Sequence, residues 1–252
     1  MIIKKTPEQI EKMHRSGKAL AEVHEELAEK IKPGAKLKEL NAFVERSIRL
    51  RGGIPSFLGY RGYPASICAS VNEMVVHGIP NGRRLKEGDI FSVDIGMILD
   101  GWHSDRAVTY PVGRIDEVAA RLLRVTEESL RAGIEQCLPG NRLGDVGQAI
   151  QGVVEEAGFN VVREYSGHGI GRSMHEDPQV PNYGPPGRGP VLEPGIVLAI
   201  EPMVNTGGWQ TKVLSDDWAV VTADGSLSAH FEHTVAVTKN GPQILTLGKV
   251  SQ

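Results

Sequence analysis

Hydrophobic residues recur at helical spacing in four stretches of the chain. The clearest are residues 7–31 and 116–137, and each is followed by a Pro-Gly pair and a second helical stretch that ends near Gly52 or Gly158. Apolar positions three, four and seven residues apart are typical of a helix with one buried face, and glycine commonly follows a helix end. The pattern predicts four helices in two pairs. In the first stretch the apolar positions are Ile10, Met13, Leu20, Val23 and Leu27.

A change of period marks the strands between the two helix pairs. The segment "DIFSVDIGMILDGWHSDRAVTYPVG" carries two strand-like runs on either side of the pair Asp100-Gly101. An Asp-Gly pair between two such runs is a strong signal for a two-residue hairpin turn. We therefore predict a β-hairpin with strands at residues 89–99 and 103–110.

The second half of the chain repeats this order of patterns. "KPGAKLKEL" (32–40) recurs as "LPGNRLGDV" (138–146) at an offset of 106 residues, and "RLKEGDIFSVD" (84–94) matches "VLEPGIVLAIE" (191–201) at an offset of 107. Ordered matches at nearly one offset indicate duplication. We expect one α+β domain over residues 1–252, built from two pseudo-twofold-related halves at roughly 5–112 and 113–247.

Composition and charge exclude several classes of protein. The 252 residues are 40% hydrophobic and 23% charged, with 28 Lys and Arg against 31 Asp and Glu. This near balance predicts no nucleic-acid partner and no anionic membrane surface. The first residues lack the apolar core of a signal peptide, and no run of about 18 apolar residues predicts a membrane span. Cys68 and Cys137 lack metal-ligand spacing, so we expect reduced thiols in a cytoplasmic protein.

The repeat brings four carboxylates to related positions. Asp94 interrupts an apolar strand and corresponds to Glu201, while Asp105 corresponds to Glu232 if the second hairpin has a loop about 20 residues longer. A carboxylate in an apolar strand costs several kcal/mol unless it is paired or binds a metal. Any one of them alone fits a solvated strand edge or half of a salt bridge. Four at twofold-related positions, with Arg106 almost the sole cation in these strands, predict a site for two divalent cations.

The segment "EYSGHGIGRSMHEDPQV" adds candidate nitrogen ligands. It places His168 and His175 among three glycines, which allow the backbone to approach a site closely. Four oxygen ligands and one imidazole suit Mn, Fe(II), Co or Zn. We take His168 as the candidate nitrogen ligand, against the alternative of a surface-loop histidine, and expect His175 to act outside the ligand set.

Five segments together resemble the type I methionine aminopeptidases: "VNEMVVHGIP", "DIGMILDGWHSD", "SGHGIGRSMHEDPQV", "AIEPMV" and "SAHFEHTVAVT", in this order. The resemblance runs from about residue 5 to 247. It implies the pita-bread fold, with two helix–strand halves around a central antiparallel sheet. It implies two divalent metal ions, both bridged by Asp105 and Glu232, with Asp94 on one ion and His168 and Glu201 on the other.

The same resemblance implies the remaining site residues. His77 and His175 would face the substrate and steady the tetrahedral intermediate, although His77 also fits a turn cap in "HGIPNG". Glu201 would move a proton to the leaving amine. The pocket for the methionine side chain would draw on Tyr60, Tyr63, Cys68 and Trp218. Two pocket positions depart from the family: Met174, where phenylalanine is common, and Phe57, where cysteine is frequent.

The implied function is removal of the N-terminal methionine from newly made polypeptides, with a small second residue preferred. The implied partners are the N-termini of nascent chains, with the ribosome as a candidate place of encounter, and a monomer is the default state. Three alternatives stay open: an Xaa-Pro aminopeptidase or proline dipeptidase of the same fold, a non-catalytic peptide-binding protein, and a structural protein whose carboxylates form salt bridges. Hydrolysis of Met-Ala-Ser against Ala-Pro, metal content and an Asp94→Asn variant separate these alternatives.

Overall fold

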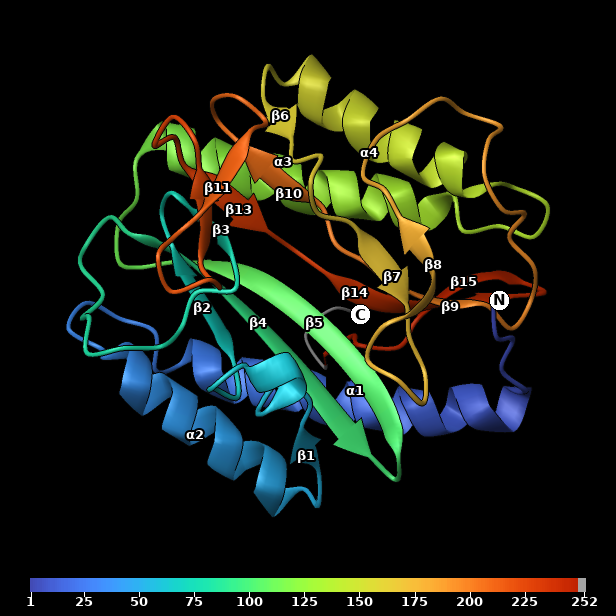
Figure 1. Cartoon of the computed structure of the whole chain (residues 1–252), viewed down its shortest axis with the longest axis horizontal. Coiled ribbons are helices and arrows are strands. Elements are labelled where there is room, and N and C mark those ends of the chain that lie inside the picture. Colours follow the sequence, from blue (N-terminus) through green and yellow to red (C-terminus); the bar gives the residue numbers. More distant parts are fainter. Residues whose placement is uncertain (249–252) are drawn as a thin grey trace.

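Two pairs of helices enclose the strands of the protein (Figure 1). The computed structural model describes residues 1–248, and the last four residues of the expected domain 1–252 lie outside this range. The four predicted helices are confirmed, and the two helices of each pair lie on the same side of the strands. Their bounds are α1 (Pro7–Ala28) and α2 (Leu37–Leu50) on one side, and α3 (Glu117–Glu135) and α4 (Leu143–Glu156) on the other.

Local chemistry accounts for where these helices begin and end. The Thr6 side chain accepts a hydrogen bond from the Gln9 N–H, and the Gln9 side chain accepts one from the Thr6 N–H, which forms a capping box at the start of α1. Asp116 caps α3 by accepting from the Ala119 N–H at 2.7 Å. Gly52 and Gly158 follow α2 and α4 with φ of 74° and 76°, a conformation that glycine adopts at little cost.

The strands form two main sheets and two small ones. In the first main sheet β4 lies between β1 and β2 and also pairs with β5; the second has the order β15-β14-β9-β7-β8. The small sheets have the orders β13-β10-β6 and β11-β12-β3. A 3₁₀ turn, η1 (Tyr60–Gly62), lies between β1 and β2. The strands are β1 (Ile54–Pro55), β2 (Cys68–Val71), β3 (Met74–Val76), β4 (Ile90–Leu99), β5 (Trp102–Pro111), β6 (Asn160–Val161), β7 (Gly167–Gly169), β8 (Glu176–Val180), β9 (Val197–Ile200), β10 (Met203–Asn205), β11 (Thr211–Val213), β12 (Val220–Thr222), β13 (Ser228–His230), β14 (His233–Thr238) and β15 (Gly241–Ile244).

The predicted hairpin is confirmed as β4 and β5, with Asp100 and Gly101 at its turn at φ of 52° and 75°. The two main sheets then meet along β5. The Glu232 N–H donates to the Ala107 carbonyl at 2.9 Å, and the Asp105 N–H donates to Thr234 Oγ1 at 2.9 Å. We call this contact between β5 and residues 232–234 the seam, because it joins the two halves of the chain.

Each helix pair covers its own hydrophobic core. On one side α1 and α2 bury Leu20, Leu27 and Ile48 with strand residues such as Phe91. On the other side α3 and α4 bury residues such as Leu130 and Ile150 with β9 and β14. Burying one such side chain stabilises the fold by about 1.5–3 kcal/mol, so the two cores hold both sheets in place on either side of the seam. Within residues 1–248, no helix combines the length and the apolar character that crossing a membrane requires.

Candidate active site

The strand register places the carboxylates of each half on one face. In the first half Asp94 lies opposite Ala107, and Asp105 lies opposite Gly96, so the two aspartates are diagonal neighbours across the β4–β5 pair. In the second half His168 lies opposite Ala199 of β9, and Ala199 is two residues before Glu201 in the chain. The seam then brings Asp105 and Glu232 together from the two halves.

Glycines around His168 allow the close strand packing that the site needs. A Cβ on Gly167 would lie 2.3 Å from the Ala199 carbonyl oxygen, and one on Gly169 would lie 2.1 Å from the Asp177 carbonyl oxygen. Real side chains do not fit at these distances, so β7 lies between β8 and β9 only because both neighbours of His168 lack a side chain. The glycine-rich segment is therefore a short strand that carries a buried histidine, and the alternative of a surface-loop histidine is wrong.

The side chains of the five predicted ligands converge at the seam. One ligand atom from each of Asp105, His168 and Glu232 lies within 4.8 Å of the other two. His168 Nε2 lies 3.6 Å from Glu201 Oε1 and 3.8 Å from Asp105 Oδ2. His168 Nδ1 lies 2.9 Å from the Gly169 carbonyl oxygen, which can only accept, so Nδ1 carries the proton and Nε2 presents its lone pair to the carboxylates.

Burial raises the pKa of every carboxylate in this group, and repulsion between carboxylates adds to it for Asp105, Glu201 and Glu232. Burial is the main cause that raises the pKa of Asp94 to about 7. Burial first, and then the negative charge of the other carboxylates, hold the pKa of Asp105, Glu201 and Glu232 well above the usual range. Burial lowers the pKa of His168 to about 3, so its imidazole is neutral at pH 7. The site thus gathers four carboxyl groups that resist ionisation unless a cation compensates them, next to a neutral imidazole, in a buried environment.

Unpartnered oxygens show that this arrangement fits cations. Asp94 Oδ1, Asp105 Oδ1 and Glu232 Oε1 are buried and have no hydrogen-bond partner within the described part of the chain. A buried carboxylate oxygen without a partner is costly, whereas coordination of a divalent ion satisfies it and offsets the repulsion. Oxygen ligands with one imidazole suit the borderline divalent metals. The residues present therefore fit a metal centre.

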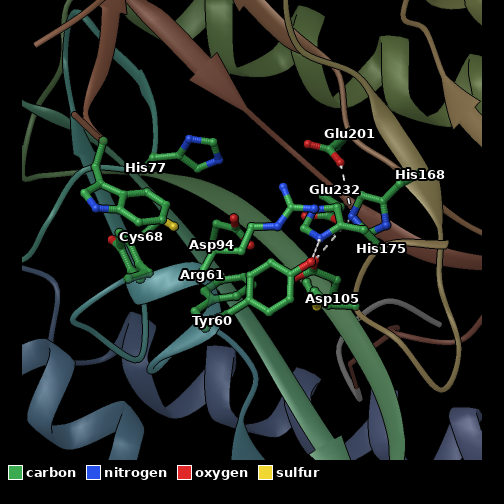
Figure 2. Close-up of a pocket in the computed structure, with 14 residues that line it drawn as sticks. Tyr60, Arg61, Cys68, His77, Asp94, Asp105, His168, His175, Glu201 and Glu232 are labelled. Carbon is green, nitrogen blue, oxygen red and sulfur yellow. Dashed lines mark hydrogen bonds and ion pairs between the residues drawn. The ribbon is translucent and has the colours of Figure 1, made fainter.

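One pocket contains all thirteen residues that the sequence singled out (Figure 2). Its floor is the carboxylate group, and its side wall is apolar. The wall includes the buried side chains of Phe57, Tyr63, Cys68 and Met174, with Trp218 packed edge-on against Tyr63 at 5.0 Å between ring centroids. Cys68 and Cys137 are both free thiols. The lining residues are Phe57, Tyr60, Arg61, Tyr63, Cys68, His77, Asp94, Asp105, His168, Met174, His175, Glu201, Trp218 and Glu232.

The two histidines predicted to face the substrate lie apart in the pocket, with His175 beside His168 and His77 away from that pair (Figure 2). His175 Nδ1 and the Tyr60 hydroxyl are 2.8 Å apart, and the His175 ring lies 4.3 Å from the His168 ring between centroids. His77 has φ of 60°, a strained conformation for a side chain of this size, and its ring lies edge-on to Tyr165 and Trp218. Burial lowers the pKa of His77 to about 4 and also lowers the pKa of His175, so both rings are neutral near pH 7.

Two residues near the site escaped the sequence argument. Arg61 lines the pocket, is exposed and has φ of 49°, and its guanidinium lies 5.4 Å from the centre of the Tyr60 ring. His230 is buried, with Nε2 3.7 Å from Glu201 Oε2. Arg61 stands in "GYRGY" between two predicted pocket tyrosines, and His230 stands two residues before Glu232 on a strand. In an extended chain, residues two apart face the same side, so the spacing of His230 and Glu232 is a sequence signal for His230.

Comparison with known proteins places this site in a family. The model of metallopeptidase family M24 matches residues 11–239, which include all five predicted ligands. The chain belongs to metallopeptidase family M24. The description of the family as metallopeptidases agrees with the unpartnered carboxylates at the seam.

Individual M24 relatives cover almost the whole chain. Methionine aminopeptidase 1 of Bacillus subtilis is 56% identical over 246 residues, which are 98% of this chain and 99% of that protein. The structure of methionine aminopeptidase from Rickettsia prowazekii superimposes with a TM-score of 0.97 at 44% identity over 98% of this chain and all of that one. The resemblance to methionine aminopeptidases and the pita-bread fold, which is α+β, are thereby confirmed.

A prolidase shares the fold at a greater distance. The prolidase from Pyrococcus horikoshii has a TM-score of 0.78 at 22% identity, and the match covers 100% of this chain but 65% of that one. At this identity the likeness concerns the M24 fold alone.

Proposed function

We propose that this M24 protein is a methionine aminopeptidase that removes the N-terminal methionine from polypeptides. The observation that carries the proposal is the pairing of a metal-ligand group with an apolar, sulfur- and aromatic-lined pocket in one cavity. Curated relatives that share about half of their residues with this chain over its full length bear the same name. A hydrolase of this kind requires both parts, because one selects the side chain and the other supplies the chemistry.

The metal ligands are proposed to be Asp94, Asp105, His168, Glu201 and Glu232. These five side chains would together hold two divalent ions, and Asp105 and Glu232 reach the site from the two sides of the seam. When bound, two divalent ions supply Lewis acidity and an activated water for attack on the peptide carbonyl. Co, Mn, Fe(II) and Zn all suit this ligand set.

The proposed catalytic residues act on the substrate's peptide bond. Glu201 would carry a proton to the leaving amine, because its carboxylate belongs to the ligand group at which the peptide bond would be cleaved. His77 and His175 would donate hydrogen bonds to the oxygen that becomes negative in the tetrahedral intermediate. Their neutral rings each keep one N–H for this purpose. The Tyr60 hydroxyl is placed to orient the His175 ring through Nδ1.

The apolar wall is proposed to select methionine. Tyr60, Tyr63, Cys68 and Trp218 would surround the side chain of the first residue, together with Phe57 and Met174. Burial raises the pKa of the Cys68 thiol well above its usual range, so this side chain presents a neutral sulfur to the thioether. The substrate's free amino group would lie against the carboxylates, which limits cleavage to one residue. A small second residue is expected from the resemblance to methionine aminopeptidases.

The wider setting is part of the same proposal. The substrates would be the N-termini of nascent polypeptides in the cytoplasm, with the ribosome as a candidate place of encounter, and the protein would act as a monomer. The chain would be one catalytic domain made of duplicated halves, roughly residues 5–112 and 113–247. Support for duplication comes from matched isolated β-bridges, Lys36 with Arg84 and Arg142 with Val191, that occur before the corresponding strands of each half.

Metal reconstitution tests the proposed function directly. Protein stripped with EDTA is loaded separately with Co, Mn, Fe(II) and Zn, and hydrolysis of Met-Ala-Ser is compared with hydrolysis of Ala-Pro. We expect activity on Met-Ala-Ser only in the presence of a divalent metal, and none above background for Asp105→Asn. Preferential hydrolysis of Ala-Pro would favour the Xaa-Pro alternative, and activity that survives without metal would contradict the mechanism.

A further inference from the structure

A buried ion pair lies directly behind the turn that carries His175. Lys5 Nζ lies 2.5 Å from Glu176 Oε2, and the two side chains are only 2% and 5% exposed. Lys5 Nζ also donates to the Ile3 carbonyl oxygen at 2.9 Å. Desolvating two charges is costly, and the attraction between them offsets that cost only when the geometry is good and the remaining polar atoms are satisfied. This pair meets both conditions.

The Glu176 carboxylate closes the turn of residues 171–176. Its Oε1 accepts hydrogen bonds from the N–H groups of Arg172 at 2.8 Å and Ser173 at 3.2 Å. The Gly171 N–H donates to the Ser173 carbonyl at 3.1 Å, and the Gly171 carbonyl accepts from the His103 N–H at 2.9 Å. The turn is therefore folded around one carboxylate and attached to the β4–β5 hairpin at one end.

Glycine at position 171 is required by the same ion pair. A Cβ there would lie 2.6 Å from Glu176 Oε1 and 2.6 Å from Lys5 Cε. The ion pair thus packs directly against the backbone of the turn, with no space between them. Any movement of the Lys5 ammonium or the Glu176 carboxylate would move that backbone.

The backbone of the turn decides where the His175 ring lies. His175 is exposed, and its ring nitrogen Nδ1 is held by the Tyr60 hydroxyl. Met174, the residue before it, is 3% exposed and forms part of the pocket wall. Since Glu176 directly follows His175, the atoms that fix Glu176 also fix the position from which the imidazole reaches the carboxylates.

Lys5 is itself held in place by the second half of the chain. Its N–H donates to the Gly195 carbonyl at 2.7 Å, and a Cβ on Gly195 would lie 2.8 Å from the Lys5 carbonyl oxygen. In Figure 1 the start of the chain lies beside β9, close to where β8 begins. The neighbouring Lys4 pairs with Glu193, but there both side chains are about half exposed, at 49% and 53%.

We propose that Lys5 is a positioning residue for His175. Its ammonium holds the buried Glu176 carboxylate, the carboxylate closes the turn 171–176, and the turn sets the distance between the His175 imidazole and the reacting carbonyl. The inference rests on the proposed function, since it assigns a catalytic consequence to the position of His175. It adds a segment ahead of the first helix to the machinery of the active site.

Lys5→Met removes the ammonium and keeps a side chain of similar length. A misplacement of about 1 Å in a catalytic group can cost about 100-fold in rate. We therefore expect kcat on Met-Ala-Ser to fall about 10- to 100-fold while KM changes less than about threefold, because the proposed metal ligands and every residue of the methionine pocket except Met174 lie outside the turn. Metal binding, measured by calorimetry with Mn, should match that of the wild type. Lys4→Met removes the exposed pair next door and should retain wild-type kcat.

A double-mutant cycle separates positioning from general weakening. Glu176→Gln should also lower kcat. The double variant Lys5→Met/Glu176→Gln should have a kcat no lower than that of the less active single variant, because the two changes break the same interaction. Effects that multiply would overturn the proposed coupling. If Lys5→Met does not fold, Glu176→Gln alone decides, and a kcat within about threefold of wild type overturns the inference.

The controls distinguish this inference from the function beneath it. Inactive metal-loaded wild type on Met-Ala-Ser would remove the proposed function and this inference together. Active wild type with an unimpaired Lys5→Met variant would overturn the inference alone. A loss of metal binding in Lys5→Met, rather than of kcat at full metal loading, would likewise overturn it by assigning the pair to the metal site.

Discussion

The two halves of the molecule share the strands that carry carboxylates and differ in most of what else faces the pocket. Asp94 on β4 and Glu201 after β9 occupy equivalent places, as do Asp105 and Glu232 at the seam. The strands that pair with β4 and β9 differ at one position. His168 of β7 lies opposite Ala199 of β9, and at the corresponding place in the first half Ser70 of β2 lies opposite Ser92 of β4. Both halves therefore contribute carboxylates, whereas an imidazole at this position occurs in the second half alone.

The hairpins of the two halves differ as much. Asp100 and Gly101 close the first one tightly, while the second is interrupted by β10 to β13. This insertion returns Trp218 to the pocket wall beside Tyr63 of the first half. Shared elements thus carry the four carboxylates that we propose as metal ligands, whereas the unshared insertion carries Trp218, which we propose as part of the selective wall.

The largest effect is expected at the seam, where both halves contribute one carboxylate. Asp105→Asn and Glu232→Gln should each lower kcat/KM on Met-Ala-Ser by at least about 10³-fold, because each removes a ligand worth several kcal/mol of charge stabilisation. Steady-state kinetics with metal analysis measures this effect. Circular dichroism should show a folded protein in both cases. A large loss in one variant and none in the other would break the equivalence of the halves.

Asp94 should make a pH-dependent contribution to the stability of the metal-free protein. The pKa of Asp94 is about 7 in the folded state, and that of an unfolded aspartate is about 3.9, so this carboxyl takes up protons on folding between these values. Its contribution to stability is fully present below about pH 4 and is lost as the pH rises to about 7, by on the order of 2–4 kcal/mol. Burial lowers the pKa of several histidines, which changes stability in the opposite direction, so the Asp94 contribution is measured as the difference in urea unfolding between EDTA-treated wild type and Asp94→Asn at several pH values. Wild type should lose stability relative to Asp94→Asn as the pH rises from about 4 to 7, and a difference that does not change with pH would contradict this assignment.

The unshared histidines should affect rate more than binding. His77→Ala and His175→Ala should each lower kcat by about 100-fold with little change in KM, since each removes a donor that acts in the transition state. Single-turnover kinetics at full metal loading checks the size and type of the effect. An equal change in KM and none in kcat would assign these residues to ground-state binding only.

The inserted segment should control side-chain selectivity. Trp218→Ala should lower kcat/KM for Met-Ala-Ser about tenfold, relative to a matched peptide with a smaller first residue, because an apolar wall is lost. Trp209 lies in the same insertion and is stacked under Arg163 outside the pocket, so Trp209→Ala is the matched control. If Trp209→Ala and Trp218→Ala change this selectivity equally, the effect comes from a disturbed fold of the insertion and not from the contact of Trp218 with the substrate.

The smallest effect is expected at the rim, from Arg61. Its exposed guanidinium should favour peptides that carry an acidic residue after the second position. Arg61→Gln should reduce the preference for Met-Ala-Asp over Met-Ala-Lys by about threefold, and added salt should have a similar effect, since exposed charges are screened. Arg114, which is 99% exposed at a remote surface, provides the control variant Arg114→Gln. An unchanged preference in Arg61→Gln would remove this role.

The sequence by itself determined much of the fold. Helical spacing, the glycines after α2 and α4, and the Asp100-Gly101 turn are local signals, because capping and turn geometry depend on neighbouring residues. Matching carboxylates in the two repeats was also visible, since alternation along a strand fixes which side chains share a face. The pocket residues followed from family resemblance rather than from local pattern.

Only the tertiary structure decided how these parts meet. The register between β5 and residues 232–234 places Asp105 beside Glu232, and no local pattern specifies a pairing between segments that lie so far apart in sequence. The ion pair of Lys5 and Glu176 and the contact of His230 with Glu201 depend on the same long-range packing. Spacing along the chain predicts which face of a strand or helix a side chain occupies. The distance between side chains from different halves is set by the two hydrophobic cores that pack on either side of the seam.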